Sequence, residues 1–84
     1  MEAKAAAQAA EAIRALGRGD VPVARTAIAH AYEIDPRAAP LLDAVNLACA
    51  ELEEEGVVSV ATWNTIADAV DSAELFAVVE GSRT

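Results

Sequence analysis

Apolar residues recur every three or four positions along most of this chain, which is the spacing of one face of an α-helix. The pattern predicts four helices. We expect the first to run from about Ala3 to Leu16, because two glycines follow closely. Asp20 then caps a second helix, which ends at Pro36 because proline has no amide hydrogen to donate. The apolar stripe of the first helix is predicted to be Ala6, Ala9, Ala10, Ile13 and Leu16.

The third predicted helix begins near Pro40 and ends at Gly56. Ser59 is a candidate cap of the fourth helix, and Thr62 is an alternative start. Asp71 is a candidate break in this helix, which leaves a short fifth helix as an option. The pattern thus predicts an all-α fold of two antiparallel helical hairpins in a single domain, residues 1–84. The apolar side of the third helix is predicted to be Leu41, Leu42, Val45, Ala48, Cys49 and Leu52.

The length and composition indicate a small domain with few large side chains in its core. Of the 84 residues 55% are hydrophobic, but nearly half of these are alanines, which bury little surface. Burial against a second copy would help so small a core, so we expect a homodimer. The single cysteine favours a reducing compartment, and neither a signal peptide nor a membrane-spanning run is recognisable. We therefore expect a cytoplasmic protein that does not bind a membrane.

The charges are divided unevenly between the two halves of the chain. Acids and bases balance through Arg37, whereas almost every charge after that residue is negative, and the formal net charge is −8. Such a surface repels phosphates, so no nucleic-acid partner is expected. A basic protein surface is the more natural complement.

Residues 19–36 carry small and large side chains at a characteristic spacing. Ala24 and Ala31 allow a neighbouring helix to approach closely, Ile28 fills the gap between them, and Pro36 ends the helix. This segment resembles the turn and second helix of a tetratricopeptide repeat. The resemblance covers about a fifth of the chain and implies a helical-hairpin scaffold that binds proteins.

Residues with catalytic chemistry are few. His30 lies on the outer face of the second predicted helix, and Cys49 falls within an apolar stripe, so we expect no catalytic residue, metal or cofactor. One enzymatic alternative remains. On two successive predicted helices, Glu51 lies three and four positions before Glu54 and Glu55, and Asp68 lies three before Asp71. This arrangement is similar to the Mg²⁺-binding pairs of all-α nucleotide pyrophosphohydrolases.

The end of the third helix is predicted to bind a protein partner. Glu51, Glu54 and Glu55 crowd the negative end of the helix dipole, and no base is nearby in the sequence, so either the first helix pair or a partner must supply one. Leu47 lies on the same outward face within this acidic surround. We interpret these four residues as a contact surface for a protein, in one version a basic one.

The segment that follows the fourth helix is apolar on nearly all sides. Its large residues point in directions that a surface helix cannot bury on one side. We expect them either between two copies or in a partner groove, or else folded back over their own bundle. The function predicted overall is a non-catalytic interaction module, with an antitoxin-like or immunity-like neutraliser of a basic protein as the alternative. The residues of this segment that we predict to be buried are Leu75, Phe76, Val78 and Val79.

Overall fold

The computed structural model describes residues 2–72 and shows an all-α bundle, as the apolar periodicity predicts. A short 3-10 turn joins the second helix to the third. The bounds of the elements are Ala3–Arg18 for α1, Val21–Ile34 for α2, Pro36–Ala38 for the 3-10 turn η1, Ala39–Glu55 for α3 and Val60–Ser72 for α4.

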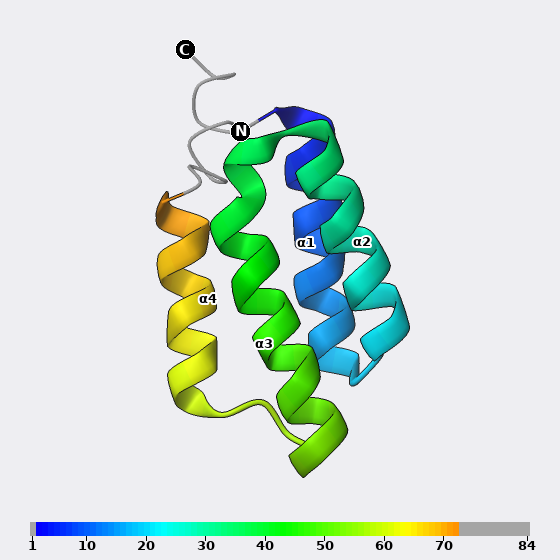
Figure 1. The fold of residues 1–84 in the computed structure, drawn as a ribbon, viewed down its shortest axis with the longest axis vertical. Coiled ribbons are helices and arrows are strands. Elements are labelled where there is room, and N and C mark those ends of the chain that lie inside the picture. The colour runs from blue at the N-terminus through cyan, green and yellow to red at the C-terminus, as the bar shows by residue number, and fades with distance from the viewer. Residues whose placement is uncertain (1, 73–84) are drawn as a thin grey trace.

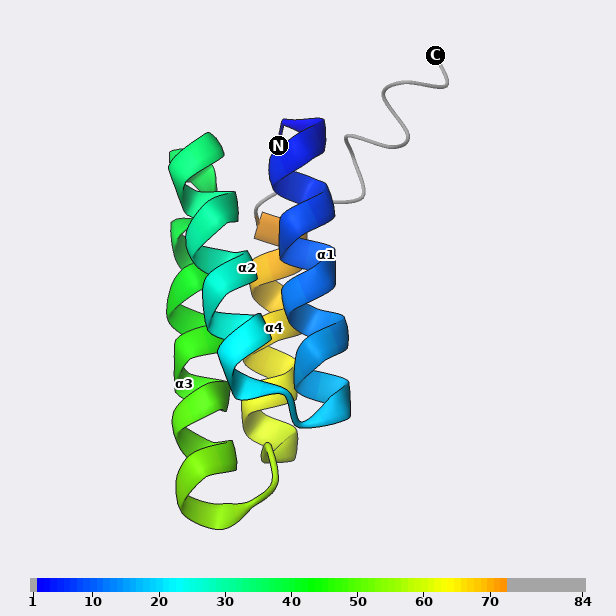
Figure 2. The ribbon, with the colours of Figure 1, turned by 90° about the vertical axis from the view of Figure 1, so that its right-hand side faces the viewer.

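The helices run alternately down and up the long axis of the molecule, so each is antiparallel to the next (Figure 1). α1 packs most closely against α2, and α3 packs against both α2 and α4. A view from the side shows α2 in front, α1 and α3 on either flank, and α4 behind (Figure 2). The described helices therefore form the two predicted hairpins, and the optional fifth helix lies outside the described residues.

Left-handed glycines end two of the helices. Gly19 caps α1 with a φ of 74°, and Gly56 caps α3 with a φ of 78°, a conformation that disfavours residues with a side chain. The end of α3 agrees with the prediction. The predicted end of α1 at Leu16 is wrong, because the helix includes Gly17 and continues to Arg18. Nothing at Gly17 requires a left-handed backbone, so it remains helical.

Side-chain oxygens begin three of the helices. The Glu2 carboxylate accepts the amides of Lys4 and Ala5, and Asp20 accepts the amide of Val23 at 3.4 Å. At the start of α4, the Ser59 hydroxyl accepts the amide of Thr62 at 3.2 Å. Ser59 is therefore the cap of α4, and the alternative start at Thr62 is wrong.

Alanines form the interface between α1 and α2. These buried alanines allow the two helices to approach closely, because the side chain of alanine is only a methyl group. Larger side chains fill the space toward α3, where Ile28, Leu41, Val45 and Cys49 are fully buried. The buried alanines of α1 and α2 are Ala5, Ala9, Ala12, Ala15, Ala24, Ala27 and Ala31.

The predicted apolar stripe of α1 is partly wrong. Ala9 and Leu16 are buried as expected, but Ala6 and Ile13 are only partly buried. The buried face is rotated toward α2, because close packing on α2 favours the smallest side chains. Ala10 and Ile13 consequently lie on a second apolar face of α1.

Asp35 ties the start of the chain to the junction between α2 and α3. Its buried carboxylate accepts the backbone amide of Glu2 at 2.9 Å and the guanidinium of Arg37 at 2.8 Å. These hydrogen bonds, that of Arg37 above all, hold the pKa of Asp35 well below its usual range. The N-terminal turn of α1 is thereby fixed beside the end of α2.

Candidate interaction groove

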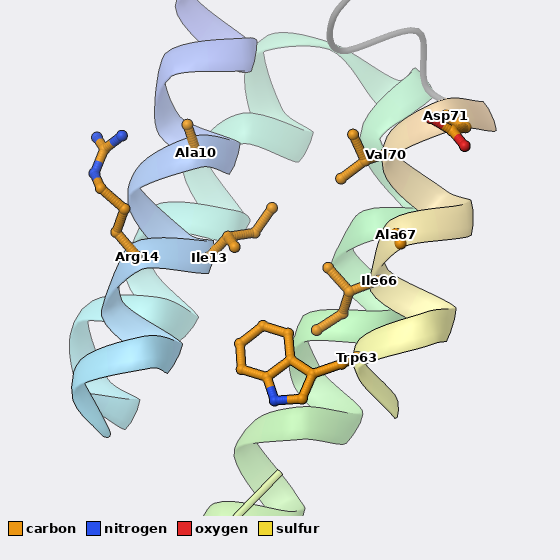
Figure 3. Close-up of a pocket in the computed structure, with 8 residues that line it drawn as sticks. All are labelled: Ala10, Ile13, Arg14, Trp63, Ile66, Ala67, Val70 and Asp71. Carbon is orange, nitrogen blue, oxygen red and sulfur yellow. The ribbon is translucent and has the colours of Figure 1, made fainter. Parts of the chain in front are cut away.

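A groove of about 480 Å³ separates α1 from α4. α4 packs closely on α3 but not on α1, so the ring of four described helices is open along this side. The two walls come from the first and last described helices. The residues that line the groove are Ala10, Ile13 and Arg14 from α1, and Trp63, Ile66, Ala67, Val70 and Asp71 from α4 (Figure 3).

Apolar side chains face one another across the groove. Ile13 points from α1 toward α4, while Ile66 and Val70 point back from α4, and the Trp63 ring lies between the two helices at one end (Figure 3). Trp63 is half-buried and packs against the core. The groove is open to solvent, but Ile66 and Val70 are only 3% and 7% exposed, so its exposed apolar surface comes mainly from the other lining residues.

Small side chains explain why the groove stays open. Ala10 on α1 and Ala67 on α4 lie on its walls and are too short to reach across. Ile13 and Ile66 partly bridge the gap, but neither wall carries a residue that fills it. Apolar area left in water in this way favours a further apolar occupant.

Charged residues stand at the rims of the groove with opposite signs. Arg14 is on the α1 rim and Asp71 on the α4 rim, and both side chains point away from the apolar floor (Figure 3). Glu11 accepts hydrogen bonds from Arg14 at 3.1 Å and from Arg18 at 3.3 Å. These two guanidinium groups lower the pKa of Glu11. The α1 rim therefore carries a positive excess.

Two of the four glutamates at the end of α3, Glu51 and Glu53, form contacts with other parts of the chain. Glu51 accepts the backbone amide of Ser59 at 2.8 Å and the hydroxyl of Thr62, so it binds the start of α4. These hydrogen bonds, that of Thr62 above all, lower the pKa of Glu51. The expectation that Glu51 faces outward for a partner is therefore corrected, since its carboxylate serves an intramolecular contact.

The base missing from the local sequence comes from the first helix pair. Arg25 on α2 donates to Glu53 at 2.7 Å and so relieves part of the repulsion at the end of α3. The next two carboxylates, of Glu54 and Glu55, are exposed and form no ion pair within residues 2–72. The predicted acidic contact surface is thus reduced to these two residues.

The different surroundings of these glutamates predict opposite effects of one substitution. Glu51→Gln should lower the melting temperature by several degrees, because the charge that anchors α4 is lost. The matched variant Glu55→Gln should leave it unchanged or raise it slightly, because it removes a negative charge from a negative helix end. Thermal unfolding followed by circular dichroism measures both.

The pH dependence of stability provides a second test of the same two variants. Because the pKa of Glu51 is lowered in the folded protein, its stabilising effect is present above the ordinary glutamate pKa and is lost as the pH falls through the lowered value. Glu51→Gln should therefore flatten the acid side of the stability profile. Equal melting temperatures for Glu51→Gln and Glu55→Gln at neutral pH would contradict the anchoring role.

The remaining predicted contact residues lie apart from the groove. Leu47 is 49% exposed on α3, as predicted, but it does not line the groove. Its role as an anchor stays a prediction. The segment with Leu75, Phe76, Val78 and Val79 lies outside the described residues.

The two candidate catalytic residues, Cys49 and His30, do not share a site. Cys49 is fully buried, and burial raises the pKa of its thiol. His30 is exposed beside a shallow hollow between α1 and α2, which Glu11 also lines. Within residues 2–72, no three His, Cys, Asp or Glu side chains come together in a way that would hold a metal ion.

Comparison of this chain with protein-family models, with curated proteins and with solved structures finds no match. The resemblance of residues 19–36 to a tetratricopeptide repeat accordingly stays a prediction. Among the described helices, none is both long enough and apolar enough to cross a membrane.

Proposed function

We propose that this protein is a small non-catalytic interaction module that self-associates through the α1/α4 groove. The observation that supports this proposal best is the apolar groove left between the first and last described helices. The resemblance to a tetratricopeptide hairpin favours the same class of function. A cytoplasmic location, inferred from the single cysteine, is part of the proposal.

The charges at the groove support a second copy as its occupant. A two-fold axis would place α1 of one copy against α4 of its partner, so that the same surface is used twice. Arg14 on one rim would then face Asp71 on the opposite rim of the other copy, and this exchange would occur on both sides. The apolar walls would close over each other and supply burial that the alanine-rich core lacks.

A charge placed in the groove should abolish the dimer. Ala67→Glu introduces a carboxylate at an exposed position of the groove wall, so the monomer should remain folded while two copies can no longer join without burying that charge. We expect Ala67→Glu to raise the dissociation constant of the dimer at least tenfold. Sedimentation equilibrium from micromolar to submillimolar concentrations measures the change.

Ala61→Glu is the matched control for this experiment. Ala61 is also exposed on the same helix but does not line the groove, so its variant should associate like the unmodified chain. If the unmodified chain stays monomeric throughout the concentration range, self-association is wrong. If both glutamate variants weaken the dimer alike, the groove is not its interface.

The exposed glutamates Glu54 and Glu55 favour the neutraliser of a basic protein as the second candidate function. A basic partner recovered by affinity capture should lose affinity when both are changed to glutamine, and its association should depend less on salt. The Mg²⁺-dependent hydrolase stays an alternative, which calorimetric titration with Mg²⁺ would test.

A further inference from the structure

An apolar run follows α4 immediately in the sequence. Residues 75–79 read Leu-Phe-Ala-Val-Val, with four large apolar side chains in five positions. α4 is described up to Ser72, and its residues Val70 and Asp71 line one end of the groove. The sequence therefore brings an apolar segment to the mouth of an apolar groove within a few residues.

The connection is long enough for the chain to reverse. Two residues, Ala73 and Glu74, lie between the end of α4 at Ser72 and Leu75. Each extended residue spans at most about 3.3–3.6 Å, so Leu75 lies within about 11 Å of Ser72. A segment that turns back there enters the groove beside Val70.

The lengths of the segment and of the groove also correspond. Along α4 the groove extends from Val70 back to Trp63, which is about 10 Å at the helical rise of 1.5 Å per residue. Extended residues from Leu75 to Val79 span about 13 Å. One short segment is thus sufficient to cover the groove from the Val70 end to the Trp63 end.

Tethering favours the segment of the same chain over any other copy. A short flexible connection holds a segment near its site at an effective concentration in the millimolar range. A second copy at micromolar concentration is present at about a thousandth of that level. An intramolecular occupant therefore has the advantage unless the second copy makes much better contacts.

We propose that Leu75–Val79 folds back into the α1/α4 groove of its own chain and competes there with the second copy. The groove is then both the self-association surface and the docking site of the segment that restrains it. The competition rests on the proposed self-association, whereas the docking of the segment does not.

The full-length chain with Phe76→Glu tests the proposal. The chain has a single tryptophan, Trp63, which lies at the far end of the groove and reports its occupancy. In dilute solution, acrylamide should quench Trp63 at least twofold more efficiently in Phe76→Glu than in the unmodified chain. At higher concentration, sedimentation equilibrium should show dimerisation strengthened several-fold, because the competing segment has left the groove.

Ser82→Glu is the matched control, since it adds the same charge to the same segment outside the apolar run. It should leave quenching and dimerisation unchanged. If Phe76→Glu lowers the helical circular dichroism signal, the milder Val78→Ala variant replaces it and should shift both measurements in the same direction.

The outcomes separate the two proposals. Equal quenching in Phe76→Glu and Ser82→Glu would overturn the docking of the segment, even where Ala67→Glu still abolishes the dimer. A dimer weakened by Phe76→Glu would place the segment in the groove of the partner copy and overturn intramolecular docking. Increased quenching in a chain that never dimerises would support the docking and refute self-association alone.

Discussion

Replacing Ile28 with alanine is expected to lower the free energy of unfolding by about 2–5 kcal/mol. Ile28 is fully buried on α2 and is one of the few large side chains in a core made mostly of alanine. Its neighbours on the same helix, Ala24 and Ala31, cannot move to fill the space that the substitution leaves. Domains of this size are stable by only about 0.05–0.15 kcal/mol per residue, so the loss is a large share of the total.

Urea unfolding followed by far-ultraviolet circular dichroism measures this loss. Ile34→Ala provides the matched control, because Ile34 lies at the end of the same helix and is 43% exposed. The control should change the free energy of unfolding by no more than about 0.5–1 kcal/mol. Comparable losses in the two variants would show that Ile28 does not fill the centre of the core.

Replacing Ala9 with leucine should destabilise the protein by about 1–3 kcal/mol, whereas the same change at the next residue should not. Ala9 is fully buried in the alanine interface between α1 and α2, where the isobutyl side chain of leucine must push the helices apart. Ala10 lines the open groove and has space beside it. Ala10→Leu should be neutral or stabilising, since it covers apolar surface that is now in water.

The same urea titration distinguishes the two leucine variants. Both add an identical side chain to adjacent positions of α1, so helix propensity is the same and the difference reports packing alone. We expect Ala9→Leu to have the lower denaturation midpoint. A lower midpoint for Ala10→Leu would mean that the buried face of α1 is turned toward α4 instead of α2.

Most helix boundaries, although not the end of α1, were predictable because they depend on residues close in sequence. Asp20, Ser59 and Gly56 cap or end helices through their own side-chain oxygens or backbone conformation. Periodicity alone could not assign the buried side of α1, because apolar residues occupy two adjacent faces of that helix. Close packing of α1 on α2 selects the face that carries Ala5, Ala9 and Ala12, which are fully buried.

The groove was harder to predict from the sequence than the fold. The apolar pattern predicts burial of Ile13, Ile66 and Val70, but Ile13 is only partly buried, and nothing local shows that α1 and α4 stay apart. The same limit applies to the acidic end of α3. Arg25 is 28 residues from Glu53, and the start of α4 that binds Glu51 is in the next helix, so both contacts require the tertiary arrangement.

The unequal packing between the helices also determines the order in which they unfold. α4 packs closely on α3 alone, whereas α1, α2 and α3 support one another. Regions with few tertiary contacts open at the lowest free energy, so we expect α4 to be the first cooperative unit to detach. Its departure leaves the hairpin of α1 and α2 intact, with the half of the groove that α1 supplies still in place. We therefore expect the amides of α4 to exchange with solvent through a partial opening, and those of α1 and α2 to exchange only through global unfolding.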